Sequence, residues 1–142
     1  MLEWNSAYET GVPAIDKQHQ VLFEHVNRLE RLLASDEIKR SEADYVLTFL
    51  EDYVQMHFSA EETCMLRYRC PAYEKNKEDH ALALNMLSFY KGQYEGTAKP
   101  KPMLVRLHQS MVWWINHHIL KVDIQLKDSI GTTAEGKPTP MV

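Results

Sequence analysis

Apolar residues recur at helical spacing along most of the 142-residue chain, and no strand-like alternation is sustained. The pattern predicts a first helix from about Ile15 to Ala34, just after Pro13, a residue that helix starts tolerate. A second helix is predicted to begin near Ser41, a candidate N-cap with Asp44 as its capping partner. It should end before Pro71, because a proline disfavours helical geometry in the preceding residue.

A third and a fourth helix are predicted from about Ala72 to Tyr94 and from about Met103 to Lys127, separated by the turn sequence EGTAKPKP. Four amphipathic helices with short connections indicate an all-α fold, an up-down-up-down antiparallel four-helix bundle. An N-terminal arm, residues 1–12, should pack across the bundle through Trp4 and Tyr8. We expect the bundle to span residues 1–130 and the polar tail 131–142 to be disordered.

Composition narrows the class of protein. The chain is 44% hydrophobic and 25% charged with a net charge of −4, which is typical of one globular domain and argues weakly against nucleic acid as a partner. No apolar run approaches the roughly 18 residues of a membrane span, and we expect no signal peptide. Cys64 and Cys70 are too few for a disulfide framework, so we expect reduced thiols in a cytoplasmic protein.

Each predicted helix carries a histidine on its apolar stripe. In an antiparallel bundle, the starts of the first and third helices lie at the same end as the finishes of the second and fourth. At a rise of about 1.5 Å per residue, seven polar residues then fall at one height near that end: His19, His57, Glu61, Asn76, His80, His118 and Asp123. The sequence therefore predicts a polar layer inside the bundle.

The spacing within this layer suits metal ligation. His57 and Glu61 are four residues apart and share a helix face, as do Asn76 and His80. Buried carboxylates are costly unless they are paired or bound to metal, and carboxylates with imidazoles in a bundle core are typical of di-iron sites. The alternative is a hydrogen-bonded polar layer without metal, although so many polar groups are hard to satisfy without an ion.

Three further histidines are expected outside this layer. His25 and His108 lie too far along their helices from His19 and His118 to reach the same centre. His117 should point away from the stripe that its neighbour occupies.

The segments GVPAIDKQHQVLF, HFSAEE and NHHILKVD, with Trp4 upstream, resemble the bacterial hemerythrins over nearly the whole chain, residues 4–130. Members of that family are four-helix proteins that bind dioxygen at two non-heme iron ions joined by an oxo or hydroxo bridge. The resemblance implies six metal ligands, with the two carboxylates bridging the irons: His19, His57, Glu61, His80, His118 and Asp123.

The resemblance also divides these ligands between the irons. His19 and His57 would hold the iron that keeps an open position for dioxygen, and His80 and His118 would hold the other. The family usually completes that second iron with another histidine, where this chain has Asn76. An amide is a harder and weaker donor than an imidazole, so Asn76 is either a ligand or a hydrogen-bonding group beside a water on the iron.

Residues near Asn76 offer no clean substitute ligand. Lys77 is cationic, Glu78 and Asp79 project off the stripe, and Glu62 is either solvated or placed behind the ligands. A further departure is an alanine, at position 83, where the family often has a bulky aromatic, which would widen the oxygen pocket. The resemblance implies that this pocket is lined by Leu22, Phe58, Trp114, Ile115 and Ile119.

The expected function is binding of dioxygen, or of another small diatomic or peroxide ligand, for carriage, storage or sensing. Because Asn76 opens the second iron, the leading alternative is enzyme-like peroxidase, oxidase or NO-reducing activity. A sensing module that acts on a signalling partner and a site for other metals such as zinc or manganese also stay open. The sequence identifies neither that partner nor a reductase.

Overall fold

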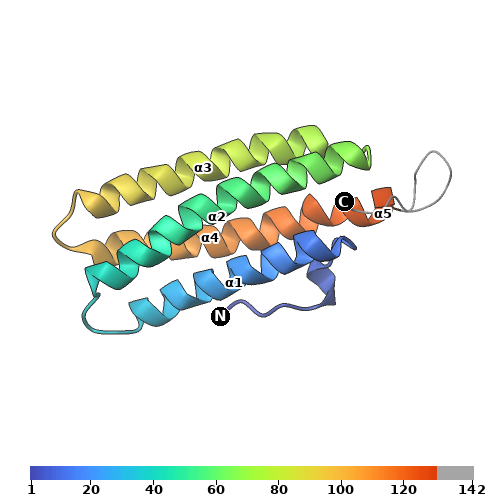
Figure 1. The fold of residues 1–142 in the computed structure, drawn as a ribbon. Helices are drawn as coiled ribbons and strands as arrows, with labels where there is room; N and C mark the ends of the chain where they lie inside the picture. Colours follow the sequence, from blue (N-terminus) through green and yellow to red (C-terminus); the bar gives the residue numbers. More distant parts are fainter. Residues whose placement is uncertain (131–142) are drawn as a thin grey trace.

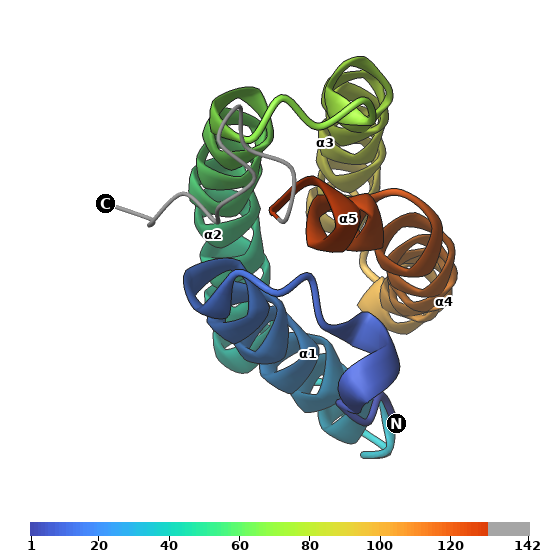
Figure 2. The same ribbon diagram turned by 90° about the vertical axis from the view of Figure 1, so that its right-hand side faces the viewer.

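The computed structural model describes residues 1–130, and within them the chain forms helices and no strand. Successive long helices run in opposite directions, and each packs against its two neighbours, including the first against the fourth (Figures 1 and 2). This arrangement confirms the antiparallel four-helix bundle. The elements are η1 (Ser6–Tyr8), α1 (Pro13–Leu33), α2 (Arg40–Arg67), α3 (Tyr73–Glu95), α4 (Pro100–Lys121), η2 (Asp123–Gln125) and α5 (Leu126–Ile130).

The predicted tail, 131–142, lies outside the described residues. No helix among residues 1–130 combines the length and the apolar character needed to cross a bilayer.

The predicted cap of α2 was wrong. The helix begins at Arg40, its N-cap is Lys39, and no side chain caps it. Asp44 instead accepts a hydrogen bond of 2.8 Å from the hydroxyl of Tyr94 on α3. The carboxylate that local spacing assigned to a cap with Ser41 therefore joins α2 to α3 instead.

The prediction of one continuous fourth helix was also wrong. Helix α4 begins three residues earlier, with Pro100 in the first turn, where no backbone N–H is needed. It ends at Lys121, and Val122 (φ −109°, ψ −58°) leads into the 3-10 turn η2. Asp123 opens that turn and is buried. The break changes the direction in which Asp123 points.

The N-terminal arm packs across α1 and α4, as predicted. The backbone of Leu2 makes two hydrogen bonds of 2.8 Å with the side chain of Asn27 on α1. Trp4 stacks on Tyr8 with 5.5 Å between ring centroids. The hydroxyl of Tyr8 donates to Asn116 on α4 over 2.7 Å, so the arm ties the first helix to the fourth.

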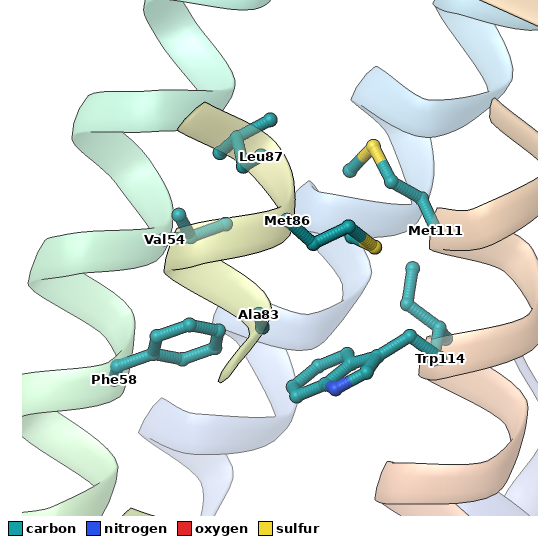
Figure 3. Close-up of a pocket in the computed structure, with 8 residues that line it drawn as sticks. Val54, Phe58, Ala83, Met86, Leu87, Met111 and Trp114 are labelled. Carbon is teal, nitrogen blue, oxygen red and sulfur yellow. The ribbon is translucent and has the colours of Figure 1, made fainter. Parts of the chain in front are cut away.

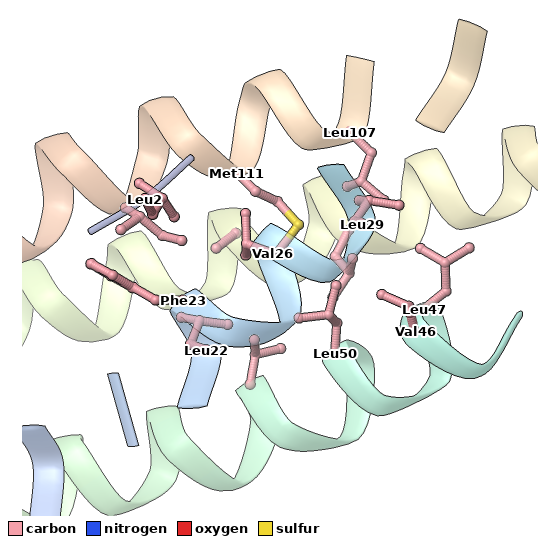
Figure 4. Packing of buried hydrophobic residues seen from close by; sticks show 14 of the residues in the cluster. Leu2, Leu22, Phe23, Val26, Leu29, Val46, Leu47, Leu50, Leu107 and Met111 are labelled. Carbon is pink, nitrogen blue, oxygen red and sulfur yellow. The ribbon is translucent and has the colours of Figure 1, made fainter. Parts of the chain in front are cut away.

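The buried side chains form two apolar clusters at different heights in the bundle. Figure 4 shows part of the larger cluster, in which side chains from α1, α2 and α4 interdigitate. The smaller cluster lies at the end of the bundle where α1 and α3 begin. Its members are Val12, Ile15, Cys64, Met65, Tyr68, Cys70, Ala72, Val122 and Leu126.

Substitution of Leu50, which is fully buried in the larger cluster, tests this core. The matched control is Leu82 on α3, which is 61% exposed. We expect Leu50→Ala to lower the free energy of unfolding by about 2–5 kcal/mol because it leaves a cavity, and Leu82→Ala to change it by less than about 0.5 kcal/mol. Urea denaturation of the metal-free proteins, followed by circular dichroism, measures both. Equal losses would contradict this description of the core.

Candidate metal centre

A layer of seven polar side chains lies between the two apolar clusters, and each residue is at most 4% exposed. They are the residues that the sequence placed at one height: His19, His57, Glu61, Asn76, His80, His118 and Asp123. Every long helix contributes a polar residue flanked by one apolar residue from each cluster. The flanking pairs are Ile15 and Leu22 on α1, Cys64 and Phe58 on α2, Ala83 on α3 with Ala72 just before it, and Ile115 on α4 with Val122 just after it.

The Nε2 atoms of two histidines converge on one side of this layer. His19 Nε2 lies 3.0 Å from Oε2 of Glu61 and 3.3 Å from Oδ2 of Asp123. His57 Nε2 lies 3.5 Å from the same oxygen of Glu61. His57 and Glu61 face together because they are four residues apart on α2. We call His19 and His57 the first half of the site.

Two more histidines converge on the other side. His80 Nε2 lies 3.1 Å from Oε1 of Glu61, and His118 Nε2 lies 2.9 Å from Oδ1 of Asp123. We call His80 and His118 the second half of the site. Each carboxylate therefore turns one oxygen toward each half, as a carboxylate that bridges two ions must.

Helix geometry alone does not bring His118 and Asp123 together. Five residues along a regular α-helix correspond to a rotation of roughly 140° between side chains. The end of α4 at Lys121 and the tighter turn that follows bring Asp123 back into the layer.

The residues present fit a metal centre. Two atoms bound to one ion at about 2.1 Å and at right angles lie roughly 3.0 Å apart, and the nitrogen–oxygen separations here are 2.9–3.5 Å. Three buried side-chain atoms make no hydrogen bond within residues 1–130, and two of them, His80 Nε2 and Asp123 Oδ1, are candidate ligand atoms of the layer. A cation in the layer would satisfy both. The candidate ligand atoms form two groups, His19–His57–Glu61 and Glu61–His80–His118–Asp123.

Protonation of the metal-free layer is uneven. Burial lowers the pKa of His19, but hydrogen bonds with Asp123 and Glu61 outweigh it and raise the pKa to about 10. Burial prevails at His57 and lowers its pKa to about 3. Burial opposes the ionisation of Glu61, yet the neighbouring imidazoles of His19, His80 and His57 outweigh it and hold its pKa well below the usual range. At neutral pH, His19 is therefore protonated and His57 is neutral.

The outer nitrogens of three histidines meet side-chain oxygens. These contacts fix each ring so that Nε2 faces the carboxylates. The Nδ1 partners are Gln18 for His57 (2.7 Å), Glu62 for His80 (2.9 Å) and Asp79 for His118 (3.2 Å).

Sequence reasoning found only part of this outer set. Glu62 lies behind a histidine, which is one of the two roles expected for it. Asp79 lies off the inward stripe of α3, as expected, but its contact with His118 on α4 was missed. The contact of Gln18 with α2 was missed as well. These contacts depend on how neighbouring helices face one another, and spacing within one helix carries no signal for them.

Asn76 is fully buried in the second half of the site. Its Nδ2 donates to Oε1 of Glu61 over 2.9 Å, and its Oδ1 lies 2.6 Å from Nε2 of His118. The amide therefore contacts one carboxylate and one histidine of the layer. Lys77 and Glu78 are exposed.

A small apolar cavity of about 30 Å³ adjoins the second half (Figure 3). Phe58 and Trp114 separate it from the layer: Phe58 stacks on His80 with 3.8 Å between ring centroids, and Trp114 stacks on His118 at 4.2 Å. Of the residues expected to line an oxygen pocket, Phe58, Trp114 and Ile115 line this cavity. Leu22 and Ile119 are buried but are not part of its wall. The other lining residues are Val54, Ala83, Met86, Leu87 and Met111.

The remaining histidines lie outside the layer. His25 and His117 each hydrogen-bond through Nδ1 to the carbonyl oxygen four residues earlier. His108 is partly buried, and burial lowers its pKa.

Zinc binding tests the protonation of the layer, because a ligating imidazole must be neutral. Binding at neutral pH should displace the His19 proton, so we expect at least one proton to be released and the apparent affinity to rise with pH from 6.5 toward about 10. Calorimetry in buffers of different ionisation enthalpy counts the protons. Release of none would show that His19 is already neutral.

Comparison with known proteins agrees with this geometry. The hemerythrin HHE cation-binding domain matches residues 10–128. The bacteriohemerythrin of Methylococcus capsulatus is 31% identical over 125 residues, covering 87% of this chain and 92% of that protein. The bacteriohemerythrin of Clostridium acetobutylicum is 25% identical over 130 residues, covering 90% and 100% respectively. A crystal structure of wild-type hemerythrin matches with a TM-score of 0.79 and 26% identity, covering 93% of this chain and 99% of that one. The chain therefore belongs to the hemerythrin family.

Proposed function

We propose that this protein binds dioxygen reversibly at two non-heme iron ions. The observation that carries the proposal is that four imidazole Nε2 atoms converge on two buried carboxylates, each with one oxygen toward each half of the site. Membership of a cation-binding family supports the presence of iron. The proposed ligands are His19, His57, Glu61, His80, His118 and Asp123.

The role of the carboxylates follows from their position. Glu61 lies in the centre of the layer and contacts histidines of both halves. Asp123 does the same from the other side, between His19 and His118. Two bridging anions would hold two cations close together and offset their charge in a dry core.

The apolar surroundings suit a reversible ligand. The iron pair, when bound, supplies the electrons and the open coordination position that dioxygen needs. The chain's own residues exclude water: the larger cluster covers one side of the layer and the smaller cluster covers the other. Phe58 and Trp114 add ring faces directly against the second half. Water and protons, which would promote loss of electrons from the site, are thereby kept away.

Asn76 donates a hydrogen bond to Glu61, and its amide oxygen, 2.6 Å from Nε2 of His118, would lie close to an iron held by the second half. This half then has two imidazoles where the family usually has three. If the amide leaves that iron open to a second ligand, enzyme-like peroxidase, oxidase or NO-reducing chemistry is the competing function.

An absorption spectrum tests the function directly. Anaerobically reduced, iron-loaded protein should develop a charge-transfer band when oxygen is admitted and lose it when oxygen is removed. Direct conversion to a stable ferric spectrum would contradict reversible binding and favour redox turnover. Iron-free protein is the control.

Substitution of Asn76 tests its role. Asn76→Ala removes the donor to Glu61 and should weaken iron binding about 10-fold to 100-fold, the usual effect of losing such a partner. Asn76→His supplies an imidazole and should slow iron release. Competition with a ferrous chelator measures both. Wild-type affinity in Asn76→Ala would contradict a role for this amide.

A further inference from the structure

Each imidazole of the second half has a carboxylate within hydrogen-bond distance of its Nδ1 atom. His80 Nδ1 lies 2.9 Å from Oε2 of Glu62, and His118 Nδ1 lies 3.2 Å from Oδ2 of Asp79. Both carboxylates are mostly buried, with side chains 24% and 15% exposed. They come from helices α2 and α3 and reach the rings from outside the layer.

In the first half, neither Nδ1 atom meets a carboxylate among residues 1–130. His57 Nδ1 lies 2.7 Å from the neutral amide oxygen of Gln18. His19 Nδ1 is buried and has no hydrogen-bond partner within residues 1–130. The asymmetry between the halves is therefore one of charge as well as of hydrogen bonding.

A carboxylate that accepts the Nδ1 proton of a ligating histidine makes Nε2 a more basic donor to a metal. A neutral amide oxygen orients the ring equally well but withdraws the proton less. Imidazoles backed by anions also favour the more highly charged state of the ion they bind, because the negative charge lies behind the ligand.

We propose that Glu62 and Asp79 make the second half the more electron-donating and more tightly metal-binding half of the site, and so compensate for the amide of Asn76. Both act as positioning and charge-donating residues through His80 and His118. The proposal rests on the proposed function only in taking the six residues as metal ligands.

Glu62 is the better of the two for a test. Asp79 also forms an ion pair of 2.8 Å with Lys75 and lines a surface cleft of about 460 Å³. The lysine offsets part of the charge of Asp79, and the contact of Asp79 with its histidine is the longer one, 3.2 Å against 2.9 Å. We therefore expect Asp79→Asn to change metal affinity in the same direction as Glu62→Gln but less.

The experiment measures the zinc affinity of each half separately, by competition with a coloured chelator. His57→Ala leaves only the second half complete, and His80→Ala leaves only the first. Adding Glu62→Gln, which is isosteric, should weaken zinc binding about 10-fold to 100-fold in the His57→Ala background. In the His80→Ala background it should change affinity by less than about twofold.

Gln18→Glu is the matched reciprocal change. It places a carboxylate behind His57 and should tighten zinc binding only in the His80→Ala background. Equal losses from Glu62→Gln in both backgrounds, or none in either, would overturn the proposal. Circular dichroism of each protein shows whether the bundle is retained.

The iron midpoint potential provides a second readout in the otherwise unchanged protein. Glu62→Gln should raise the potential and Gln18→Glu should lower it, by about 59 mV for each tenfold change in the relative affinity for the two oxidation states. Loosened structure would weaken binding of both states alike, so unchanged potentials would overturn the proposal. Zinc binding needs no dioxygen. The titrations can therefore succeed where reversible oxygenation fails, or fail where it succeeds.

Discussion

Placing two carboxylates inside an apolar bundle is the constraint on which this structure depends. Taking an anion out of water costs several kcal/mol unless a cation or hydrogen bonds compensate for it. Glu61 is fully buried, and Asp123 is nearly so. The compensation comes from four surrounding imidazoles and one amide, and these in turn need helices that present polar residues at a single height between two apolar clusters.

The orientation of three histidines in the layer is set by residues outside it. A hydrogen bond at Nδ1 keeps the ring of a histidine from turning when Nε2 binds a metal. Gln18, Glu62 and Asp79 provide that restraint from three helices. The layer thus resembles the apolar core in one respect: the rings of His57, His80 and His118 are each held by a residue from a neighbouring helix.

Sequence patterns were sufficient for the features that repeat along one helix. The period of apolar residues gave the bundle, and the heights of the inward polar residues gave the layer. What they missed depends on contacts between elements: Asp44 bonds to Tyr94 and does not cap a helix, and Asp79 meets His118 across a helix interface. The sequence patterns also failed to predict the break after Lys121, because apolar spacing continues through it to Leu126.

The position of Asp123 beyond that break determines when the layer can form during synthesis. The carboxylate of Asp123 is supplied by η2, after all four long helices, while His19 comes from the start of the first. The two groups that meet over 3.3 Å are separated by most of the bundle's sequence. A chain emerging from the ribosome can therefore fold helices and bury apolar faces long before the layer can exist. The complete centre can form only after the chain has been synthesised through η2 and has folded so that η2 meets the start of α1.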